Sequence, residues 1–494
     1  MSRIGWNEPR FDQEDIREVT KVLEDAYVNE GPETKQLEEE LKKYLNVKNI
    51  ILTTSATSAL FLAIKADAII RNLKDFEVIV PDMTMIATAM AVSWAGGKPI
   101  LVDVDKEKMT LDIEKIKNKI TPKTSAIIPV HILGRAPNME RLKELAQKHN
   151  LSIIEDAAGA LGSKYKNNFL GTIGKVGCFS LQSNKIITCG QGGIIATNDD
   201  EYNEVIRRLR DFGRADKEFI HKIEGYNLKF NDLSASLALS QFRKIDKIKE
   251  NLIQQKLKYE TNLSDIEEIK IIKTDLFSGE IPLWVDVIVE DRDELISYLN
   301  SEQIFPRKCW PSLHRNPPYQ FQGTDNDFPN SSFISDNCLW LPNGPAISLE
   351  QIDHICNKIK EFYNMKKFAE LELQKINEDK RGAIYLVKDL LSYGKEFTFL
   401  QMRKGCARGG CLHKNQEFFV VIKGKIKFIC GDQERIVEAG SSGEIPPNTS
   451  HAFVALEDSI VSEWGITTEE KQQDQKDPNL RRIVDQINEE LKLK

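Results

Sequence analysis

The fold of this chain is decided by residues 153–199, IIEDAAGALGSKYKNNFLGTIGKVGCFSLQSNKIITCGQGGIIATND. The stretch opens with a predicted apolar strand that runs directly into Asp156, and it closes with a second predicted apolar strand at 194–197. Lys185 and a glycine cluster, GQGG at 190–193, lie between the two strands. In open parallel sheets, ligands bind where the C-terminal ends of strands meet loops. Asp156 and Lys185 are therefore the first candidates for chemistry.

The residues before this stretch alternate short β-branched runs with longer helical patterns. Short apolar strands separated by helices are typical of βα units, and hence of a mostly parallel sheet with helices on both faces. The predicted strands are 47–54, 76–80, 98–104, 125–130 and 151–155, and the predicted helices between them are 58–70, 86–95, 112–119 and 138–149.

Beyond residue 230 the pattern changes twice. One long amphipathic helix is predicted at 232–263 and a charged helix at 364–380, and after the second come short strands between Gly- or Pro-marked turns. Such turns are typical of a small barrel or sandwich. We therefore expect a large α/β domain at 1–250, a smaller α/β domain at 251–366, an all-β barrel at 382–470 and a terminal helix at 471–494.

The overall composition excludes several classes of protein. Lys and Arg total 68 against 75 Asp and Glu, a net charge of -7, which disfavours a nucleic-acid partner. The longest apolar stretch, 86–97, is shorter than the ~20 residues that a membrane helix needs, and the first residues lack the apolar core of a signal peptide. Eight scattered cysteines suit reduced thiols. We expect a cytoplasmic enzyme without a membrane partner.

The pairing of Asp156 with Lys185 matches one cofactor in particular. Pyridoxal phosphate (PLP) needs a carboxylate that keeps its pyridine nitrogen protonated and a lysine that binds its aldehyde carbon. Its phosphate needs exposed N–H groups and small hydroxyls at a helix N-terminus, which residues 53–58 (TTSATS) and 179–180 supply. Each feature alone is more often a helix cap or a solvated lysine, so the order and spacing carry the inference.

Residues 1 to about 365 resemble the DegT/DnrJ/StrS family of PLP-dependent sugar aminotransferases. The resemblance implies a fold-type I aminotransferase. Such a fold has a mostly parallel sheet of seven strands, flanked by helices, and a small α/β domain. It is carried by VNEGPETKQLEEEL (28–41), TTSATSAL (53–60), VPDMTMIATAMAV (80–92), ITPKTSAIIPVHILG (120–134), the 153–199 stretch and GYNLKFNDLSASLALSQF (225–242).

The resemblance also implies roles for single residues. Lys185 is expected to bind PLP covalently and then to move the proton during transamination, while Asp156 keeps the pyridine nitrogen protonated. The cofactor phosphate is expected to be bound by Thr57, Ser58 and Ser180.

Three further residues follow from the same resemblance. Asn227, in the GYN motif, is expected to reach the phosphate from a neighbouring subunit, which implies a homodimer with shared active sites. His131 and His314 fall in segments that line the family's active site, although a histidine in such a segment is often a packed structural group.

The sequence departs from the family pattern at three positions. Met85 stands where many members place an aromatic ring on the pyridine, and a thioether covers that face less rigidly. Gly159 replaces a common polar residue, and Gln191 replaces an acidic residue or glycine. Members that dehydrate sugars carry His in place of Lys185, so transamination is favoured.

The expected reaction transfers nitrogen from glutamate to a nucleotide-linked keto sugar. The local sequences around NKIIT (184–188), TMIAT (84–88) and EDAA (155–158) are most similar to those of perosamine-type and legionaminic-type 4-aminotransferases. A 4-keto-6-deoxy sugar nucleotide is therefore expected as substrate, for surface polysaccharide or glycoconjugate synthesis. The nucleotide stays open.

Residues 405–455 resemble the two sequence motifs of the cupin family, which implies a jelly-roll barrel. The resemblance implies a divalent metal held by His413, Glu417 and His451, with Cys411 in place of the first motif histidine. Asn448 and Ala455 also depart from the second motif. The alternative is a metal-free barrel that binds sugar or stabilises the oligomer.

Two other functions stay open. RGGCLHK at 408–414 is similar to a motif of cupin-like sugar-nucleotide 3,4-ketoisomerases, which would make the chain a bifunctional isomerase and 3-aminotransferase with His413 as an acid/base group. A non-catalytic sensor of PLP or sugar belongs to a different class, and it would not need the Asp156–Lys185 pair.

Overall fold

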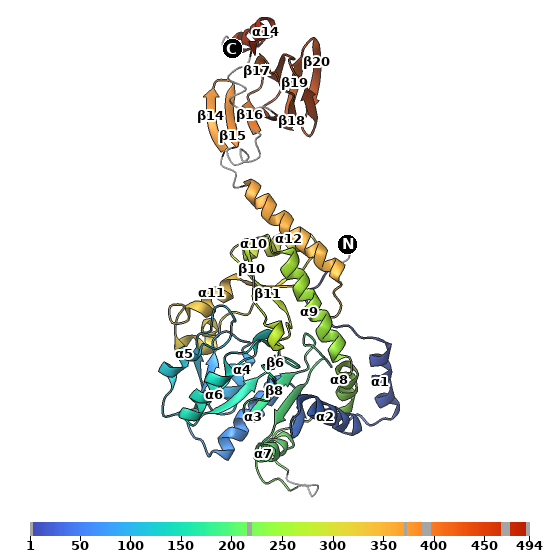
Figure 1. Ribbon diagram of the computed structural model, residues 1–494, viewed down its shortest axis with the longest axis vertical. Helices are drawn as coiled ribbons and strands as arrows, with labels where there is room; N and C mark the ends of the chain where they lie inside the picture. The colour runs from blue at the N-terminus through green and yellow to red at the C-terminus, as the bar shows by residue number, and fades with distance from the viewer. Residues whose placement is uncertain (1–2, 215–219, 370–372, 388–396, 466–474, 491–494) are drawn as a thin grey trace. The chain divides into compact units, whose positions relative to one another are not determined.

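The computed structural model describes residues 3–214, 220–369, 373–387, 397–465 and 475–490. The chain divides into two compact units, Met1–Tyr363 and Asn364–Lys494, and Figure 1 shows helices and strands in the first and mostly strands in the second. Each unit is described by itself below.

A seven-stranded sheet forms the centre of the first unit. Its only antiparallel strand is β9, which pairs with β1 on one side and β8 on the other, while the remaining neighbours are parallel. The predicted mostly parallel sheet is therefore confirmed. The strand order is β1 (Asn49–Thr53), β9 (Gly193–Thr197), β8 (Val176–Ser180), β5 (Ser152–Asp156), β4 (Thr124–Ile127), β2 (Glu77–Pro81) and β3 (Lys98–Val102).

Helices cover both faces of this sheet. Alternate residues of β1 belong to different apolar clusters: Ile50 and Leu52 pack in one, and Ile51 packs in the other. This alternation follows from the two-residue period of a strand. One cluster contains α2 (Pro32–Leu45) and α6 (Met139–Lys148), and the other contains α3 (Ala56–Ile70), α4 (Ala87–Trp94) and α7 (Asp200–Arg210).

The predicted single helix at 232–263 is wrong, because it is broken into α8 (Asp232–Phe242) and α9 (Ile245–Asn262). Lys244 leaves helical geometry with φ -101° and ψ 5°. Its Nζ lies 2.9 Å from a carboxylate oxygen of Asp12 and 2.7 Å from one of Asp15. These ion pairs join segments more than 200 residues apart, so the local pattern gives no sign of the break.

A smaller antiparallel sheet completes the first unit. Its strand order is β10 (Ile269–Ile271), β11 (Val285–Val289), β13 (Cys338–Leu341) and β12 (Arg307–Lys308). The helices α10 (Arg292–Ser301), α11 (Pro329–Asn337) and α12 (Leu349–Ala369) belong to the same region. The α12 helix ends within the predicted helix 364–380, in which residues 373–379 instead form strand β14 (Leu373–Asp379), while 370–372 lie outside the described residues.

The second unit consists of two antiparallel sheets and a helix. One sheet has the order β14, β15 (Gly382–Val387), β16 (Phe397–Met402), β23 (Ser459–Trp464), β18 (Glu417–Lys423) and β21 (Ser442–Ile445), and the other has the order β20 (Gln433–Glu438), β19 (Lys425–Cys430), β22 (His451–Ala455), β17 (Ala407–Leu412) and β24 (Gln475–Lys476). Phe419, Phe428 and Phe453 form the centre of the core between them. The predicted all-β domain is confirmed.

Two features of this unit extend the sequence-based picture. Strand β14 pairs with β15 before residue 382, where we expected the barrel to begin. Helix α14 (Pro478–Glu490) buries Leu480 and Val484 against Ala407 of β17.

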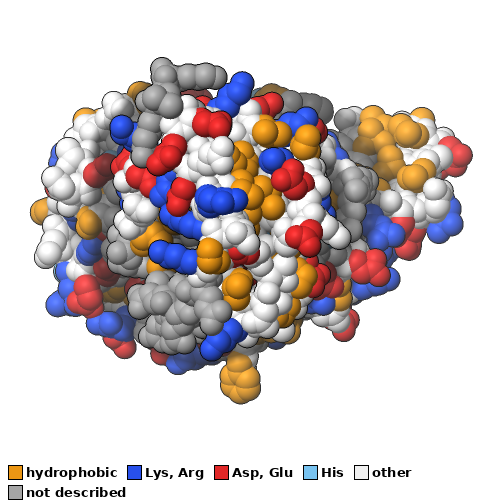
Figure 2. All heavy atoms as spheres, turned by 90° about the horizontal axis from the view of Figure 1, so that it is seen from above, with side chains coloured by type: hydrophobic (Ala, Val, Ile, Leu, Met, Phe, Trp, Pro, Cys, Tyr) orange, Lys and Arg blue, Asp and Glu red, His pale blue; other side chains and the backbone are white. Residues whose placement is uncertain are grey.

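The described residues include no helix that is long and apolar enough to cross a membrane. On the face shown in Figure 2, basic and acidic side chains are intermixed.

Candidate functional site

Asp156 ends β5 and lies at the C-terminal edge of the seven-stranded sheet. Its side chain is buried, and the hydroxyl of Thr88 in α4 donates to one carboxylate oxygen over 2.7 Å. The backbone N–H of Ala158 donates to the other oxygen over 3.1 Å. Burial raises the pKa of Asp156, although both hydrogen bonds and the nearby Lys185 favour its charged form. The carboxylate is thus fixed in direction and suited to a cationic N–H partner.

Lys185 lies in the turn between β8 and β9 and is half-buried. Burial lowers its pKa to about 8, and the negative charge of Asp156 opposes this shift. Its Nζ lies 5.3 Å from the centroid of the Trp284 ring, and the Trp284 indole N–H donates to the carbonyl of Asn184 over 3.2 Å. A larger fraction of the amine is uncharged near neutral pH, which makes it a better nucleophile.

Trp284 belongs to a cluster of four tryptophans. Its ring centroid lies 4.6 Å from those of Trp6 and Trp340 and 5.8 Å from that of Trp310. Sequence reasoning did not identify Trp284 or Thr88 as site residues. Thr88 lies within a stretch quoted for the family resemblance, whereas Trp284 reaches Lys185 only through tertiary packing.

Hydroxyl groups converge at the N-terminus of α3. Ser55 caps the helix by accepting from the backbone N–H of Ser58 over 3.1 Å. The Ser58 hydroxyl lies 2.9 Å from that of Thr54 and 2.8 Å from that of Ser55, and Thr57 lies in the same turn, half-buried. Helix N-termini with exposed N–H groups favour anions.

Strand register brings this turn next to Ser180. Gly193 in β9 is paired with Thr53 of β1 on one side and with Ser180 of β8 on the other. A Cβ atom on Gly193 would lie 2.2 Å from the carbonyl oxygen of Ser55, so only glycine permits this approach. The register therefore brings Ser180 toward the turn that carries Thr57 and Ser58, and we call this candidate anion site the phosphate cradle.

The combined groups fit PLP. A buried carboxylate, an amine with a lowered pKa and a phosphate cradle come from the C-terminal ends of β5, β8 and the β1–α3 connection. This is the donor set that the pyridine nitrogen, the aldehyde and the phosphate of PLP require.

Met85 and Asn227 occupy exposed positions near this edge. The Met85 sulfur accepts from the backbone N–H of Ala87 over 3.0 Å, and its carbonyl accepts from Thr88, the residue that binds Asp156. Asn227 is exposed and lies two residues before Lys229, which bridges Thr53. Both positions leave a side chain accessible to a cofactor or to a second subunit.

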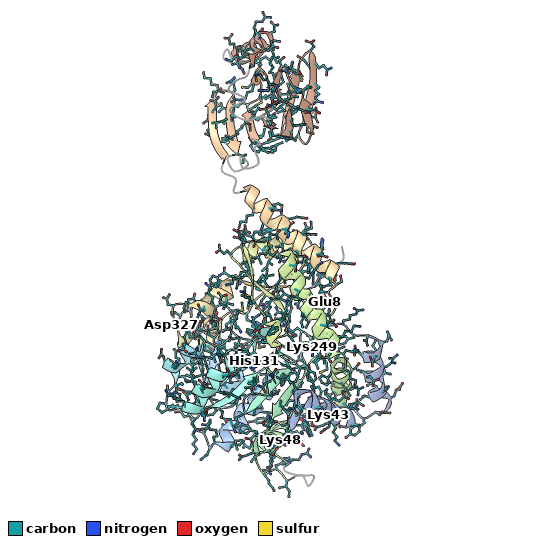
Figure 3. The ribbon with its side chains drawn as sticks, in the orientation of Figure 1. Glu8, Lys43, Lys48, His131, Lys249 and Asp327 are labelled. Carbon is teal, nitrogen blue, oxygen red and sulfur yellow. The ribbon has the colours of Figure 1, made fainter. Side chains whose placement is uncertain are left out.

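His131 is fully buried within the first unit (Figure 3). Its Nε2 lies 2.7 Å from a carboxylate oxygen of Glu155, which also accepts from the backbone N–H groups of Gly171, Ile173 and Gly174. Among the described residues its Nδ1 has no hydrogen-bond partner. These contacts make His131 part of the support behind Asp156 rather than an open ligand-binding group.

His314 has both ring nitrogens next to carboxylates. Nδ1 lies 2.7 Å from Asp82, which follows β2, and Nε2 lies 2.8 Å from Asp325. Burial works against the charged imidazole, but the two carboxylates outweigh it and raise the pKa of His314. His314 thus lies at the same edge of the sheet between two carboxylates, with Asp325 as its exposed partner.

A second set of titratable side chains converges inside the barrel. The Nε2 atom of His413 lies 3.7 Å from Cys411 Sγ and 3.4 Å from a Glu417 oxygen. The Nε2 atom of His451 lies 3.6 Å from Glu417 and 3.6 Å from Glu463. The candidate ligand atoms of Cys411, His413 and His451 all lie within 4.8 Å of one another, as do those of Glu417, His451 and Glu463. Sulfur, imidazole and carboxylate at these distances suit a transition metal or zinc.

The structure brings together all four predicted barrel residues and adds Glu463. Cys411 and His451 are paired across β17 and β22, whereas Glu463 arrives through the pairing of β18 with β23. Glu463 lies outside both sequence motifs, so only strand pairing reveals it.

Comparisons with known proteins identify a family for each unit. The DegT/DnrJ/EryC1/StrS aminotransferase family matches residues 9–360, and the cupin domain matches residues 400–464. The GDP-perosamine synthase of Escherichia coli O157:H7 is 31% identical over 380 residues, which cover 74% of this chain and 100% of that protein. The spore coat polysaccharide biosynthesis protein SpsC of Bacillus subtilis is 29% identical, covering 72% of this chain and 96% of that protein.

Solved structures agree as well. The crystal structure of S. venezuelae DesV superimposes with a TM-score of 0.69 at 28% identity, covering 73% of this chain and 99% of that one. The expected fold-type I aminotransferase followed by a cupin barrel is confirmed. The chain is an enzyme that belongs to the DegT/DnrJ/EryC1/StrS aminotransferase family.

Proposed function

We propose that the first unit uses PLP to transfer an amino group to the keto group of a nucleotide-linked deoxysugar. The observation that carries this proposal is the position of Asp156 and Lys185 at one sheet edge beside the phosphate cradle. The names of the two curated relatives support a nucleotide-sugar acceptor and a role in polysaccharide synthesis. We further propose a 4-keto-6-deoxy sugar as acceptor and glutamate as donor.

Each residue of the site has a separate task in this reaction. Bound PLP supplies an electron-withdrawing ring that carries the amino group between donor and acceptor. Lys185 Nζ binds the cofactor and, with a pKa near 8, accepts and returns a proton near neutral pH. Asp156 accepts from the ring N–H while Thr88 holds the carboxylate in place. Thr57, Ser58 and Ser180 would hold the phosphate at the N-terminus of α3, and the exposed Met85 would contact the cofactor.

The acceptor and donor are tested by product analysis. The full-length protein with PLP is incubated with glutamate and, in separate reactions, with GDP-, dTDP- and UDP-linked 4-keto-6-deoxy sugars. We expect one of them to gain an amino group, detected by mass spectrometry, with release of 2-oxoglutarate. Failure of every keto sugar with every amino-acid donor would favour the sensor.

We also propose a homodimer in which Asn227 acts on the partner's cofactor. Large apolar side chains are exposed around α1 (Gln13–Glu24) and near Asn227, namely Ile16, Leu23, Tyr27 and Tyr226. A second copy of the chain would remove this surface from water.

Mixing two inactive variants tests the shared site. Hybrid dimers of K185A and N227A contain one intact site only if Asn227 acts across the interface. Random mixing then restores about a quarter of the wild-type activity. No restoration after subunit exchange would place Asn227 in its own subunit's site.

For the second unit we propose a divalent metal held by His413, Glu417 and His451, with Cys411 and Glu463 in reach. The metal content of the full-length protein tests this, and H413A should lose the metal. The bifunctional alternative predicts that the same variant yields no 3-amino sugar from a 4-keto substrate. Unchanged conversion by H413A would exclude a catalytic role for the barrel.

A further inference from the structure

A cavity of about 320 Å³ opens beside the barrel cluster. Small-molecule sites typically measure ~300–1,000 Å³, so this cavity lies at the small end of the range and suits a small ligand better than a whole sugar nucleotide. Its wall combines the side chains of the cluster with apolar Ile384, Leu400 and Phe453. The cavity therefore offers polar contacts on one side and a surface for a short carbon body on the other.

Arg408 lines the same cavity from β17. It is paired across strands with Phe453, which lies two residues after His451 on β22, so the three side chains share one face of the sheet. Arg408 is only 5% exposed. One Nη atom donates to the carbonyl of Gly382 over 2.8 Å. Its Nε–H is buried and has no hydrogen-bond partner among the residues that the structure describes.

The charges around the cavity leave Arg408 without a counter-charge of its own. Arg381 and Arg481, which also line the cavity, are paired with Asp379 and Asp485. Within the described part of the chain, the one ion pair of Arg408 is with Asp379, at 3.4 Å, and Arg381 shares this carboxylate. Glu417 and Glu463 would neutralise a bound divalent ion, so the metal-loaded cavity retains the positive charge of Arg408.

We propose that the barrel binds a small carboxylate that bridges the metal ion and the guanidinium of Arg408. A buried guanidinium with a free N–H is costly unless an acceptor reaches it, and Arg pairs well with the two oxygens of a carboxylate. One carboxylate oxygen ligates the metal and the other accepts from Arg408, while the carbon body lies against Ile384, Leu400 and Phe453. This inference rests on the metal site proposed above and not on the transamination reaction.

Calorimetric titration tests the proposal on the full-length protein with PLP bound. Oxalate is titrated into the metal-free protein, the Mn²⁺-loaded protein and the Mn²⁺-loaded variants R408Q and R403Q. R403Q is the matched control because Arg403 is an exposed arginine of the same unit. Inorganic phosphate serves as the second anion, and the electron paramagnetic resonance spectrum of Mn²⁺ reports whether the anion reaches the metal.

We expect oxalate to bind only after Mn²⁺ and to change the Mn²⁺ spectrum. R408Q should weaken oxalate about 10- to 100-fold while Mn²⁺ affinity and the thermal unfolding midpoint stay near those of the wild type, and R403Q should have no effect. R408K, which keeps the charge, should recover part of the affinity.

Three results would overturn the proposal. Oxalate affinity equal in R408Q and wild type removes Arg408 from the site. Binding of Mn²⁺ without any binding of oxalate rejects the anion site and leaves the proposed metal site standing. Absence of Mn²⁺ binding rejects both sites. Phosphate binding tighter than oxalate, with the same dependence on Arg408, replaces the carboxylate by a phosphate ligand.

Discussion

The two sites of this chain are built in opposite ways. The aminotransferase site lies at an open sheet edge, where each carboxylate oxygen of Asp156 accepts a hydrogen bond. Gly193 has no Cβ atom, which allows the turn at Ser55 to approach its backbone closely. The barrel cluster lies inside a closed sheet pair and gathers side chains of both charge signs around a cavity. The first arrangement suits the proton transfer proposed above, and the second suits the proposed metal ion. We therefore expect a substitution that disables one site to leave the other site unchanged.

The largest effect should come from D156N. The amide cannot keep the pyridine nitrogen protonated, so turnover should fall by about 10²- to 10³-fold while metal content stays unchanged. Turnover with glutamate and keto sugar, measured beside metal analysis, checks this. D75N, which alters an exposed carboxylate paired with Lys123, is the control. A comparable loss in D75N would point to damaged folding.

Removal of the metal should affect the second unit and leave the reaction of the first unit unchanged. E417Q removes a buried carboxylate, 1% exposed, and should weaken divalent metal binding by about 10- to 100-fold. The glutamate half-reaction of the first unit should not change, in this variant or after treatment with a chelator. E444Q, an exposed glutamate on β21, should keep the metal. A chelator that abolished the glutamate half-reaction would break the independence of the two sites.

The amine of Lys185 should lose its proton at a lower pH than an ordinary lysine does. Its pKa of about 8 leaves it about 90% uncharged at pH 9, against about 4% for a lysine of pKa ~10.4. In cofactor-free protein, acylation of Lys185 followed by mass spectrometry should rise with pH around a midpoint near 8. Acylation of a lysine with the ordinary pKa of ~10.4 should still be rising at pH 9. A midpoint for Lys185 above 10 would contradict the role of burial.

The smallest effect is expected from T88V. Loss of the hydroxyl removes one hydrogen bond to Asp156 and should lower turnover by about 10-fold. The pKa of Asp156 should rise further, because the lost bond favoured its charged form. The acidic limb of the pH–rate profile should therefore move to higher pH. T172V, a threonine whose hydroxyl donates to the carbonyl of Phe169, should leave the profile unchanged.

Local patterns in the sequence were sufficient to predict the mostly parallel sheet, and they singled out Asp156, Lys185 and the four barrel residues as candidates for the two sites. The strands that carry them are short apolar runs, and each functional side chain follows or lies within such a run. Contacts between distant segments were not predictable. At the helix break Lys244 pairs with Asp12 and Asp15, Trp284 meets Lys185 from the bend before β11, and Glu463 enters the cluster by strand pairing. None of these contacts leaves a periodic pattern in the local sequence from which it could be predicted.

The proposed transamination requires that Lys185 and Asp156 hold PLP. The most direct test is the absorbance spectrum of the full-length protein with PLP, before and after glutamate, for wild type, K185A and K175A. We predict a visible band of lysine-bound PLP in wild type and K175A that moves into the near ultraviolet with glutamate and is absent in K185A. No visible band in wild type after added PLP, or an unchanged band in K185A, would contradict this account.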